Sequence, residues 1–201
     1  MVLKRTVDLC LSAFALVFLC PLLSVIAVMI RLEDGGPVFY RGVRVGRGGV
    51  PFRIFKFRTM VVNAERLGGP STADDDPRVT RIGRWLRSSK LDELPQLLNV
   101  MNGEMSLVGP RPEVPQEVAL YSEEERMLLS VRPGVTDWAS LRFHDEGAIL
   151  RGAPDAHEKY RHAIRPEKVR LGLEYVRTGS FGTDLRILAS TVRMVIGARF
   201  R

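Results

Sequence analysis

A long uncharged run near the N-terminus limits what this chain can fold into. Residues 9–30 carry no charged side chain, and charged residues flank them (Lys4, Arg5 and Asp8 before, Arg31 after). An apolar run of 22 residues matches a helix that enters a bilayer better than a core helix of a soluble domain. It is too long for the apolar part of a secretory signal, and no small-residue cleavage site follows it. The sequence therefore predicts membrane attachment.

Pro21 leaves the path of this segment through the membrane open. A straight helix of this length reaches ~33 Å and spans the hydrocarbon. Proline removes one backbone hydrogen bond and favours a kink, and Ser24 is close enough to bond a carbonyl that the proline frees. A sharp kink would return both ends to one side, and basic residues at both ends suit a cytoplasmic placement. A spanning helix that tolerates Pro21 is the simpler interpretation, because proline is common in membrane helices.

The rest of the chain predicts one small, helix-rich α/β domain. Of the 201 residues, 45% are hydrophobic and 26% charged, which is typical of globular proteins. The apolar run and the mixed composition after it divide the chain into a membrane segment at residues 1–34 and a domain at residues 35–201 that is large enough to hold a catalytic site. Strand formers at 38–40 and 52–57 are separated by glycines and predict a hairpin.

Helices and one loop complete the predicted domain. Apolar spacing predicts helices over residues 91–101, 113–129 and 167–175. Residues 68–77 are rich in glycine, proline and aspartate and predict a mobile, solvated loop rather than a metal site.

The C-terminal segment predicts a basic amphipathic helix. Its apolar stripe and its arginines are Leu185, Leu188, Ala189, Val192 and Ile196 with Arg186, Arg193, Arg199 and Arg201. Such a helix can lie on a membrane surface, but packing against a core explains the stripe equally well.

Charge and motif content restrict the partners. The formal net charge is +7, which indicates an anionic partner: nucleic acid, lipid headgroups or a phosphorylated substrate. No nucleotide-binding glycine motif is present, and no nucleic-acid reading motif supports a nucleic-acid partner. The histidines lack zinc-ligand spacing. Cys10 and Cys20 would lie ~15 Å apart on a helix, too far for a disulfide.

Asp92 and Glu93 are the candidate catalytic residues. Ser89 lies three residues before Asp92 and matches a capping box, so the two carboxylates have a purely structural explanation as the first turn of a helix. Nearby, Pro110 and Pro112 fix the backbone around Arg111, which presents one guanidinium for a bidentate grip on phosphate.

Further cations gather around this pair in the sequence. Arg132 precedes Pro133-Gly134 in a second rigid turn, and Arg87 and Lys90 immediately precede the carboxylates. Two carboxylates among several cations are typical of a site that handles phosphate, where a carboxylate acts as nucleophile or metal ligand.

The order of these motifs closely resembles the bacterial sugar transferases, which are small monotopic phosphoglycosyl transferases. The resemblance covers essentially the whole chain and is carried by the apolar segment followed by Phe-Lys-Phe-Arg-Thr-Met at 55–60, Leu-Asp-Glu-Leu-Pro-Gln at 91–96, Met-Ser-Leu-Val-Gly-Pro-Arg-Pro at 105–112 and Arg-Pro-Gly-Val-Thr at 132–136. It implies an α/β fold anchored by a re-entrant helix-break-helix, with amphipathic helices on the membrane. Cys20-Pro21 stands where members usually have Ser-Pro, so the break is expected at Pro21, against the simpler interpretation above.

The resemblance also implies a reaction. Members transfer a sugar phosphate from a UDP-sugar to polyprenol (undecaprenyl) phosphate and release UMP. Asp92 is then expected as nucleophile, with Mg²⁺ held by Asp92 and Glu93. Arg111 is expected to bind the diphosphate, flanked by Pro110 and Pro112. The supporting substrate contacts are expected at Arg58, Arg87, Lys90 and Arg132.

For two residues, Glu93 and His144, the family pattern does not fix a role. Glu93 is expected to coordinate metal or to position other groups, because the acceptor phosphate has a second pKa of about 6 and needs no strong base. Many members read Gly-Trp-Ala-Gln and then Gly-Arg, whereas this chain has Asp137-Trp138-Ala139-Ser140 and then Phe143-His144. His144 therefore replaces an arginine thought to contact substrate, with Arg142 as an alternative, and it fits a surface histidine equally well.

The resemblance further implies a place in the cell and partners. The expected location is the cytoplasmic face of the bacterial inner membrane, with membrane lipids as partners, and a homodimer is compatible with the sequence. Two rival functions stay open: a membrane-bound glycosyltransferase that releases UDP, and a non-catalytic membrane adaptor. The adaptor is disfavoured because Asp92 and Arg111 are both present.

High salt tests the predicted anchor. Each well-placed Lys or Arg adds about 1 kcal/mol to binding of an anionic membrane, and salt screens that part. We expect washes in about 1 M salt to leave the full chain in the membrane fraction because residues 9–30 stay inserted, whereas detergent releases it. Complete release by salt alone would contradict the anchor.

Overall fold

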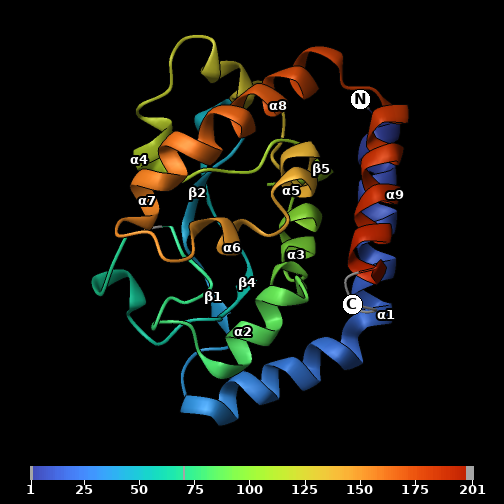
Figure 1. Ribbon diagram of the computed structural model, residues 1–201. Coiled ribbons are helices and arrows are strands. Elements are labelled where there is room, and N and C mark those ends of the chain that lie inside the picture. Colours follow the sequence, from blue (N-terminus) through green and yellow to red (C-terminus); the bar gives the residue numbers. More distant parts are fainter. Residues whose placement is uncertain (1, 70, 198–201) are drawn as a thin grey trace.

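The protein consists of helices packed around short strands (Figure 1). The computed structural model describes residues 2–69 and 71–197. The α-helices are α1 (Val2–Asp34), α2 (Arg81–Ser88), α3 (Gln96–Met101), α4 (Pro115–Val118), α5 (Trp138–Arg142), α6 (Glu146–Leu150), α7 (Ala156–Lys159), α8 (Arg165–Thr178) and α9 (Phe181–Gly197). The 3₁₀ helices are η1 (Arg47–Gly49), η2 (Ala64–Arg66), η3 (Leu91–Glu93) and η4 (Glu125–Ser130), and η5 (Tyr160–Ile164) is a short π-helix. This helix-rich α/β arrangement confirms the predicted fold class.

Helix α1 is one long helix that bends into two arms (Figure 1). Pro21 lies inside it, and an interior proline is the usual cause of a sharp kink. The carbonyl that Pro21 frees belongs to Val17, four residues earlier. Ser24 Oγ instead donates to the Cys20 carbonyl at 2.9 Å, so the expected replacement of the lost bond is wrong. A serine bonded to the carbonyl four residues back bends a helix further.

The outer surface of α1 is apolar. Phe14, Val17 and Phe18 are each more than two-thirds exposed, and the helix is long and apolar enough to cross a membrane. The second arm packs into the domain, where Ile26 and Ile30 join a buried cluster with Phe57 and others. Helix α1 is therefore compatible with membrane association and is also part of the fold.

The predicted hairpin is confirmed as two nested antiparallel pairs. Strand β2 (Val43–Val45) pairs with β3 (Pro51–Arg53), and β1 (Phe39–Tyr40) pairs with β4 (Lys56–Phe57) outside them. The fully buried Asn99 of α3 fixes this hairpin, since its side-chain oxygen accepts from the Phe55 amide at 2.7 Å and its nitrogen donates to the Arg53 carbonyl at 2.9 Å. Lys56 is thereby held beside the start of α3.

A parallel pair forms the other strand element. Strand β5 (Ser106–Val108) pairs with β6 (Gly134–Thr136), with Ser106 opposite Gly134. Just beyond β5 the backbones touch: a Cβ added to Gly134 would lie 2.1 Å from the Gly109 nitrogen, and one added to Gly109 would lie 2.4 Å from the Arg132 carbonyl oxygen. This close contact fixes the position of Gly109, which leads through Pro110 to Arg111.

One predicted helix is wrong as a single element. Residues 113–129 form α4 and η4 with a break between them. Ser122 causes the second start, because its hydroxyl accepts from the Glu125 amide at 3.2 Å while Glu125 Oε2 accepts from the Ser122 amide at 2.8 Å. This reciprocal pair is a capping box. The predicted helix at 167–175 is confirmed within α8, and residues 91–101 divide into η3 and α3.

The aspartate-rich segment is a loop whose carboxylates are engaged. Asp74 pairs with Arg151 at 3.2 Å, Asp75 accepts from the Gly152 amide at 3.3 Å, and Asp76 pairs with Arg78 at 2.7 Å. Asp74 and Asp75 thus contact the chain after α6, while both residues stay exposed, as predicted for a solvated loop.

The face of α9 that packs against the core differs in part from the predicted apolar stripe. Ile187 and Asp184 are buried and Leu188 of the stripe packs against the core, whereas Leu185 and Val192 are about half exposed and Ala189 is exposed. Core packing therefore explains only part of the stripe. The predicted side-chain role of Ile196 and the positions of Arg199 and Arg201 lie outside the residues whose side chains the structure describes.

Gly134→Ala tests the backbone contact beside β5. An added methyl meets backbone that cannot rotate away, so we expect a loss of about 1–3 kcal/mol, or a fall in Tm of about 2–10 °C. The control is Gly182→Ala in α9, where the nearest atom would lie 3.8 Å away and alanine favours the helix. Thermal unfolding in detergent measures both, and an unchanged Tm for Gly134→Ala would show that the two loops are not in tight contact.

Candidate active site

The two candidate carboxylates lie on a single tight turn, η3, between α2 and α3. Lys90 precedes them with a left-handed backbone (φ 57°), a conformation that is strained for a non-glycine residue and clusters at functional sites. Ser89 ends α2, and its hydroxyl donates to the Trp85 and Leu86 carbonyls at 2.8 and 3.1 Å. The predicted capping box at Ser89 is therefore wrong, and the structural explanation for Asp92 falls with it.

Asp92 is almost completely buried and is paired with a lysine. Its side chain is only 3% exposed, and its Oδ2 atom lies 2.8 Å from Nζ of Lys56 on β4. Sequence reasoning assigned Lys56 to a basic hairpin and missed it as a site residue. The signal was available: in strand β4, Phe57 is buried in the core, so alternation directs Lys56 to the opposite side.

Glu93 binds two cations at once. Its Oε1 atom lies 3.2 Å from Lys56 Nζ, and Arg111 grips both carboxylate oxygens, with Nη1 3.1 Å from Oε2. Burial alone would raise the pKa of Glu93, but the charges of Arg111 and Lys56 outweigh it and hold the pKa well below the usual range. Glu93 is therefore ionised and holds both cations in place.

Arg111 is mounted on a rigid loop, as predicted. Pro110 and Pro112 are buried on either side of it, and the Pro110 carbonyl accepts from the Gly134 amide at 3.0 Å. The adjacent Glu93 raises the pKa of Arg111 further above its ordinary value. The negative charges of Asp137 and Glu146 raise this pKa in the same direction.

Arg87 and Lys90 complete the positive surroundings. Arg87 donates from Nε to the Thr59 hydroxyl at 2.9 Å. Burial lowers the pKa of Arg87, and the Asp92 charge opposes that shift. Partial desolvation lowers the pKa of Lys90, and Glu93 and Asp92 oppose it in the same way. Both cations thus lie within electrostatic reach of the carboxylates.

Two of the other expected residues, Arg58 and Arg132, bond partners outside this cluster. Arg58 is buried and bonds Asp34 at the end of α1 and the Pro37 carbonyl at 2.6 Å. Arg132 donates to the Gly103 carbonyl at 2.9 Å, away from the carboxylates. His144 is exposed after α5. Arg58 and Arg132 are used inside the fold, and their expected substrate contacts would require them to leave these partners.

The carboxylate pair suits a metal that arrives with its substrate. Mg²⁺ favours oxygen ligands and is commonly held by one or two carboxylates together with substrate phosphates. Within residues 2–69 and 71–197, no group of three or more His, Cys, Asp and Glu side chains could hold a metal alone. Lys56 contacts only Oδ2 of Asp92, whereas both oxygens of Glu93 are bonded. The donor set therefore fits Mg²⁺ through Asp92 more readily than through Glu93.

Comparison with known proteins gives a consistent result. Residues 1–198 match the bacterial sugar transferase family. A protein of Caulobacter vibrioides named UDP-glucose:undecaprenyl-phosphate glucose-1-phosphate transferase is 40% identical over 94% of this chain and 68% of its own length. The Bacillus subtilis protein named uncharacterized sugar transferase EpsL is 39% identical over 98% of this chain and 88% of its own. The undecaprenyl-phosphate glucose phosphotransferase of Komagataeibacter xylinus is 39% identical over 98% of this chain, which spans only 36% of that relative.

Geometry and comparison agree on the class. Two adjacent carboxylates among cations, on a small domain joined to an apolar helix, define a site for a phosphate-bearing substrate in a membrane-compatible protein. The chain belongs to the bacterial sugar transferase family, which confirms the resemblance drawn from its motifs.

Glu93→Gln tests the ionised bridge. Because the folded pKa of Glu93 lies below the unfolded value of about 4.3, its charge stabilises the fold above that pH and the contribution fades as pH falls below it. We expect Glu93→Gln to lower Tm at pH 7 by roughly 2–10 °C, and the gap to wild type to narrow below about pH 4.

The matched control is Glu123→Gln, which removes the same charge from an exposed side chain. Its Tm should follow wild type at every pH. A Glu93→Gln deficit that stays constant from pH 7 to pH 3 would show that the carboxylate charge is not what stabilises the bridge.

Proposed function

We propose that this chain transfers a sugar-1-phosphate from a UDP-sugar to polyprenol (undecaprenyl) phosphate, releasing UMP and forming a polyprenyl diphosphate sugar. The buried Asp92, held beside Lys56 and next to the Glu93–Arg111 bridge, carries this proposal. Relatives named as undecaprenyl-phosphate sugar phosphotransferases support the substrate class.

The charge of the site matches a nucleoside diphosphate sugar. Four cations (Lys56, Arg87, Lys90 and Arg111) surround the two carboxylates Asp92 and Glu93. A UDP-sugar brings one negative charge on each of its two phosphates, which these cations can offset. Fixed cations at this position also stabilise the charge that develops at phosphorus.

Asp92 acts as the nucleophile in this reaction. A carboxylate oxygen attacks the sugar-bearing phosphorus, the bond to the bridging oxygen breaks, and UMP leaves with that oxygen and the electron pair. The sugar phosphate is then joined to Asp92 as an acyl phosphate. An oxygen of polyprenol phosphate attacks the same phosphorus and releases Asp92 as a carboxylate. Magnesium, when bound by Asp92, supplies further neutralisation of phosphoryl charge.

Lys56 and Glu93 support this sequence of steps. Lys56 orients Asp92 before the donor binds, and its ammonium is then available to phosphoryl oxygens. Glu93 holds Lys56 and Arg111 apart at a fixed spacing. No strong base is needed, because the acceptor phosphate is largely ionised at neutral pH. The loss of activity in Glu93→Gln should accordingly persist at high pH.

The membrane placement belongs to the same proposal. The bend in α1 and the basic residues at both of its ends (Lys4, Arg5 and Arg31) support a re-entrant helix whose ends lie on the cytoplasmic face of the inner membrane. The exposed stripe of α9 supports contact of that helix with the lipid surface. The acceptor is thereby presented at the same interface.

The released nucleotide tests the proposed reaction. Detergent-solubilised protein is mixed with Mg²⁺, undecaprenyl phosphate and a panel of UDP-sugars, and nucleotides are separated by chromatography. We expect UMP from wild type with one or more donors, and a fall of at least about 10³-fold in Asp92→Asn, because covalent catalysis is lost. Chelation of Mg²⁺ should stop release.

The alternatives predict other products. UDP in place of UMP would assign the chain to the glycosyltransferases and overturn the role of Asp92. Full activity in Asp92→Asn would also overturn it. The adaptor function predicts that neither nucleotide forms with any donor.

A further inference from the structure

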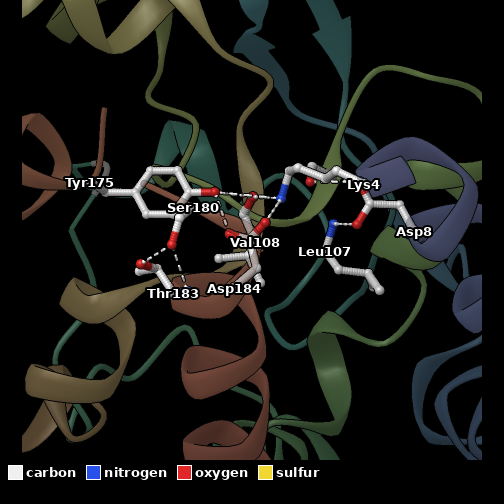
Figure 2. A network of polar contacts seen from close by, with 9 residues as sticks. Lys4, Asp8, Leu107, Val108, Tyr175, Ser180, Thr183 and Asp184 are labelled. Atoms are coloured by element: carbon white, nitrogen blue, oxygen red, sulfur yellow. Dashed lines mark hydrogen bonds and ion pairs between the residues drawn. The ribbon is translucent and has the colours of Figure 1, made fainter. Parts of the chain in front are cut away.

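A polar stripe runs along the inner face of the first arm of α1. Lys4, Asp8 and Ser12 are four residues apart, and Asp8 and Ser12 are buried although the opposite face of the helix is apolar. Helical residues at this spacing lie on one face. Burying a polar group in such a helix costs free energy unless the group has a hydrogen-bond or ion-pair partner. Polar groups that are kept there therefore often have a function. The partners of Lys4 and Asp8 lie on β5, α8 and α9 (Figure 2).

The first arm completes the free edge of β5. The Ser106 amide points to β6, where the Pro133 carbonyl accepts it at 2.8 Å, so the Leu107 amide points to the opposite edge. There Asp8 accepts from the Leu107 amide at 3.3 Å and from the Ser106 hydroxyl at 2.7 Å. Side chains of α1 thus take the place of a neighbouring strand.

Lys4 holds the end of the same strand. Its ammonium donates to the Val108 carbonyl at 3.0 Å and pairs with Asp184 of α9 at 2.7 Å (Figure 2). The Tyr175 hydroxyl donates to Asp184 at 2.6 Å and lies 3.2 Å from the same carbonyl. Burial, reinforced by Asp184, raises the pKa of Tyr175, so the phenol stays protonated and serves as a donor. The carboxylate of Asp184 is buried and shared between these two groups.

Strand β5 leads directly to the arginine of the site. Val108 is followed by Gly109 and Pro110 and then by Arg111, and the close contact of Gly109 with Gly134 transmits the position of the strand to the loop. A shift of β5 would therefore move the guanidinium relative to Glu93.

We propose that Lys4, Asp8 and Asp184 are positioning residues for the proposed transfer, and that they act through β5 on Arg111. The first arm of α1 is then part of the active site's support as well as an anchor. The inference rests on the proposed function only in naming the donor diphosphate as the ligand that Arg111 binds. Its geometric content, the dependence of β5 on α1, is separate.

Lys4→Met removes the charge and keeps a side chain of similar length. Steady-state kinetics of this variant test whether Lys4 acts through Arg111. We expect the KM for the UDP-sugar to rise about tenfold, as for loss of a charge-assisted hydrogen bond, with the KM for undecaprenyl phosphate within about twofold of wild type. Lys4→Arg should restore the donor KM. Arg126→Gln, an exposed charge of η4, is the control and should behave as wild type.

A double-mutant cycle separates positioning from general destabilisation. If Lys4 acts through Arg111, the combined Lys4→Met and Arg111→Lys variant loses far less kcat/KM than the product of the two single losses. Losses that multiply, or a Lys4→Met protein with an unchanged donor KM, would overturn the proposal. Asp184→Asn, which keeps the side-chain shape, undergoes the same cycle if Lys4→Met does not fold.

Hydrogen exchange provides a readout that needs no reaction. The amides of residues 107–109 and 111 should exchange at least about tenfold faster in Lys4→Met than in Arg126→Gln, because the Val108 carbonyl loses the Lys4 ammonium and the edge of β5 opens more often. Equal exchange in the two variants would overturn the proposal even if wild type releases UMP. If Lys4→Met exchanges faster but the wild type releases no UMP, the result would count against the proposed function alone.

Discussion

The ionised Glu93 is the constraint on which the site depends. It joins three segments that are distant in sequence: β4 through Lys56, the turn η3 that carries Asp92, and the loop after β5 through Arg111. Without a carboxylate between them, two cations would repel each other at short range in a half-buried place. With it, Lys56 and Arg111 are kept at a fixed geometry next to Asp92. The turn that carries Asp92 has little regular structure of its own, and the ion pairs of Asp92 and Glu93 hold it in place.

Much of this arrangement was predictable because it depends on local chemistry. Proline on both sides of Arg111 dictates a rigid mount, and the apolar run dictates an exposed helix, so both predictions agree with the structure. The hairpin followed from strand formers around glycines. Asp92 was identified by its place in a motif, whereas its surroundings were identified only in part.

The failures share a cause, which is competition between equivalent local signals. Ser89 and Ser122 both precede an acid by three residues, yet only Ser122 forms a capping box, because the hydroxyl of Ser89 is used to end α2. Arg58 and Lys56 are two residues apart in one basic motif, but Lys56 lies in β4 and pairs with Asp92, whereas Arg58 follows the end of the strand and pairs with Asp34. The stripe of α9 has the right period for a core, but of the stripe residues whose side chains the structure describes only Leu188 packs there, beside the buried Ile187. Tertiary partners decide each of these cases.

The long reach of the Lys4–Asp184 pair has a consequence for how the molecule is made. The two residues are 180 positions apart, and a ribosome adding about 5–20 residues per second needs roughly 10–40 s to pass from one to the other. The apolar helix emerges first and can enter the bilayer while its polar face still lacks partners. The strand that carries the arginine loop gains the Asp184 support only after the first turn of α9 has been made. Insertion and assembly of the site are therefore separate events in time, and a chain stalled late in synthesis would be anchored with its polar network still incomplete.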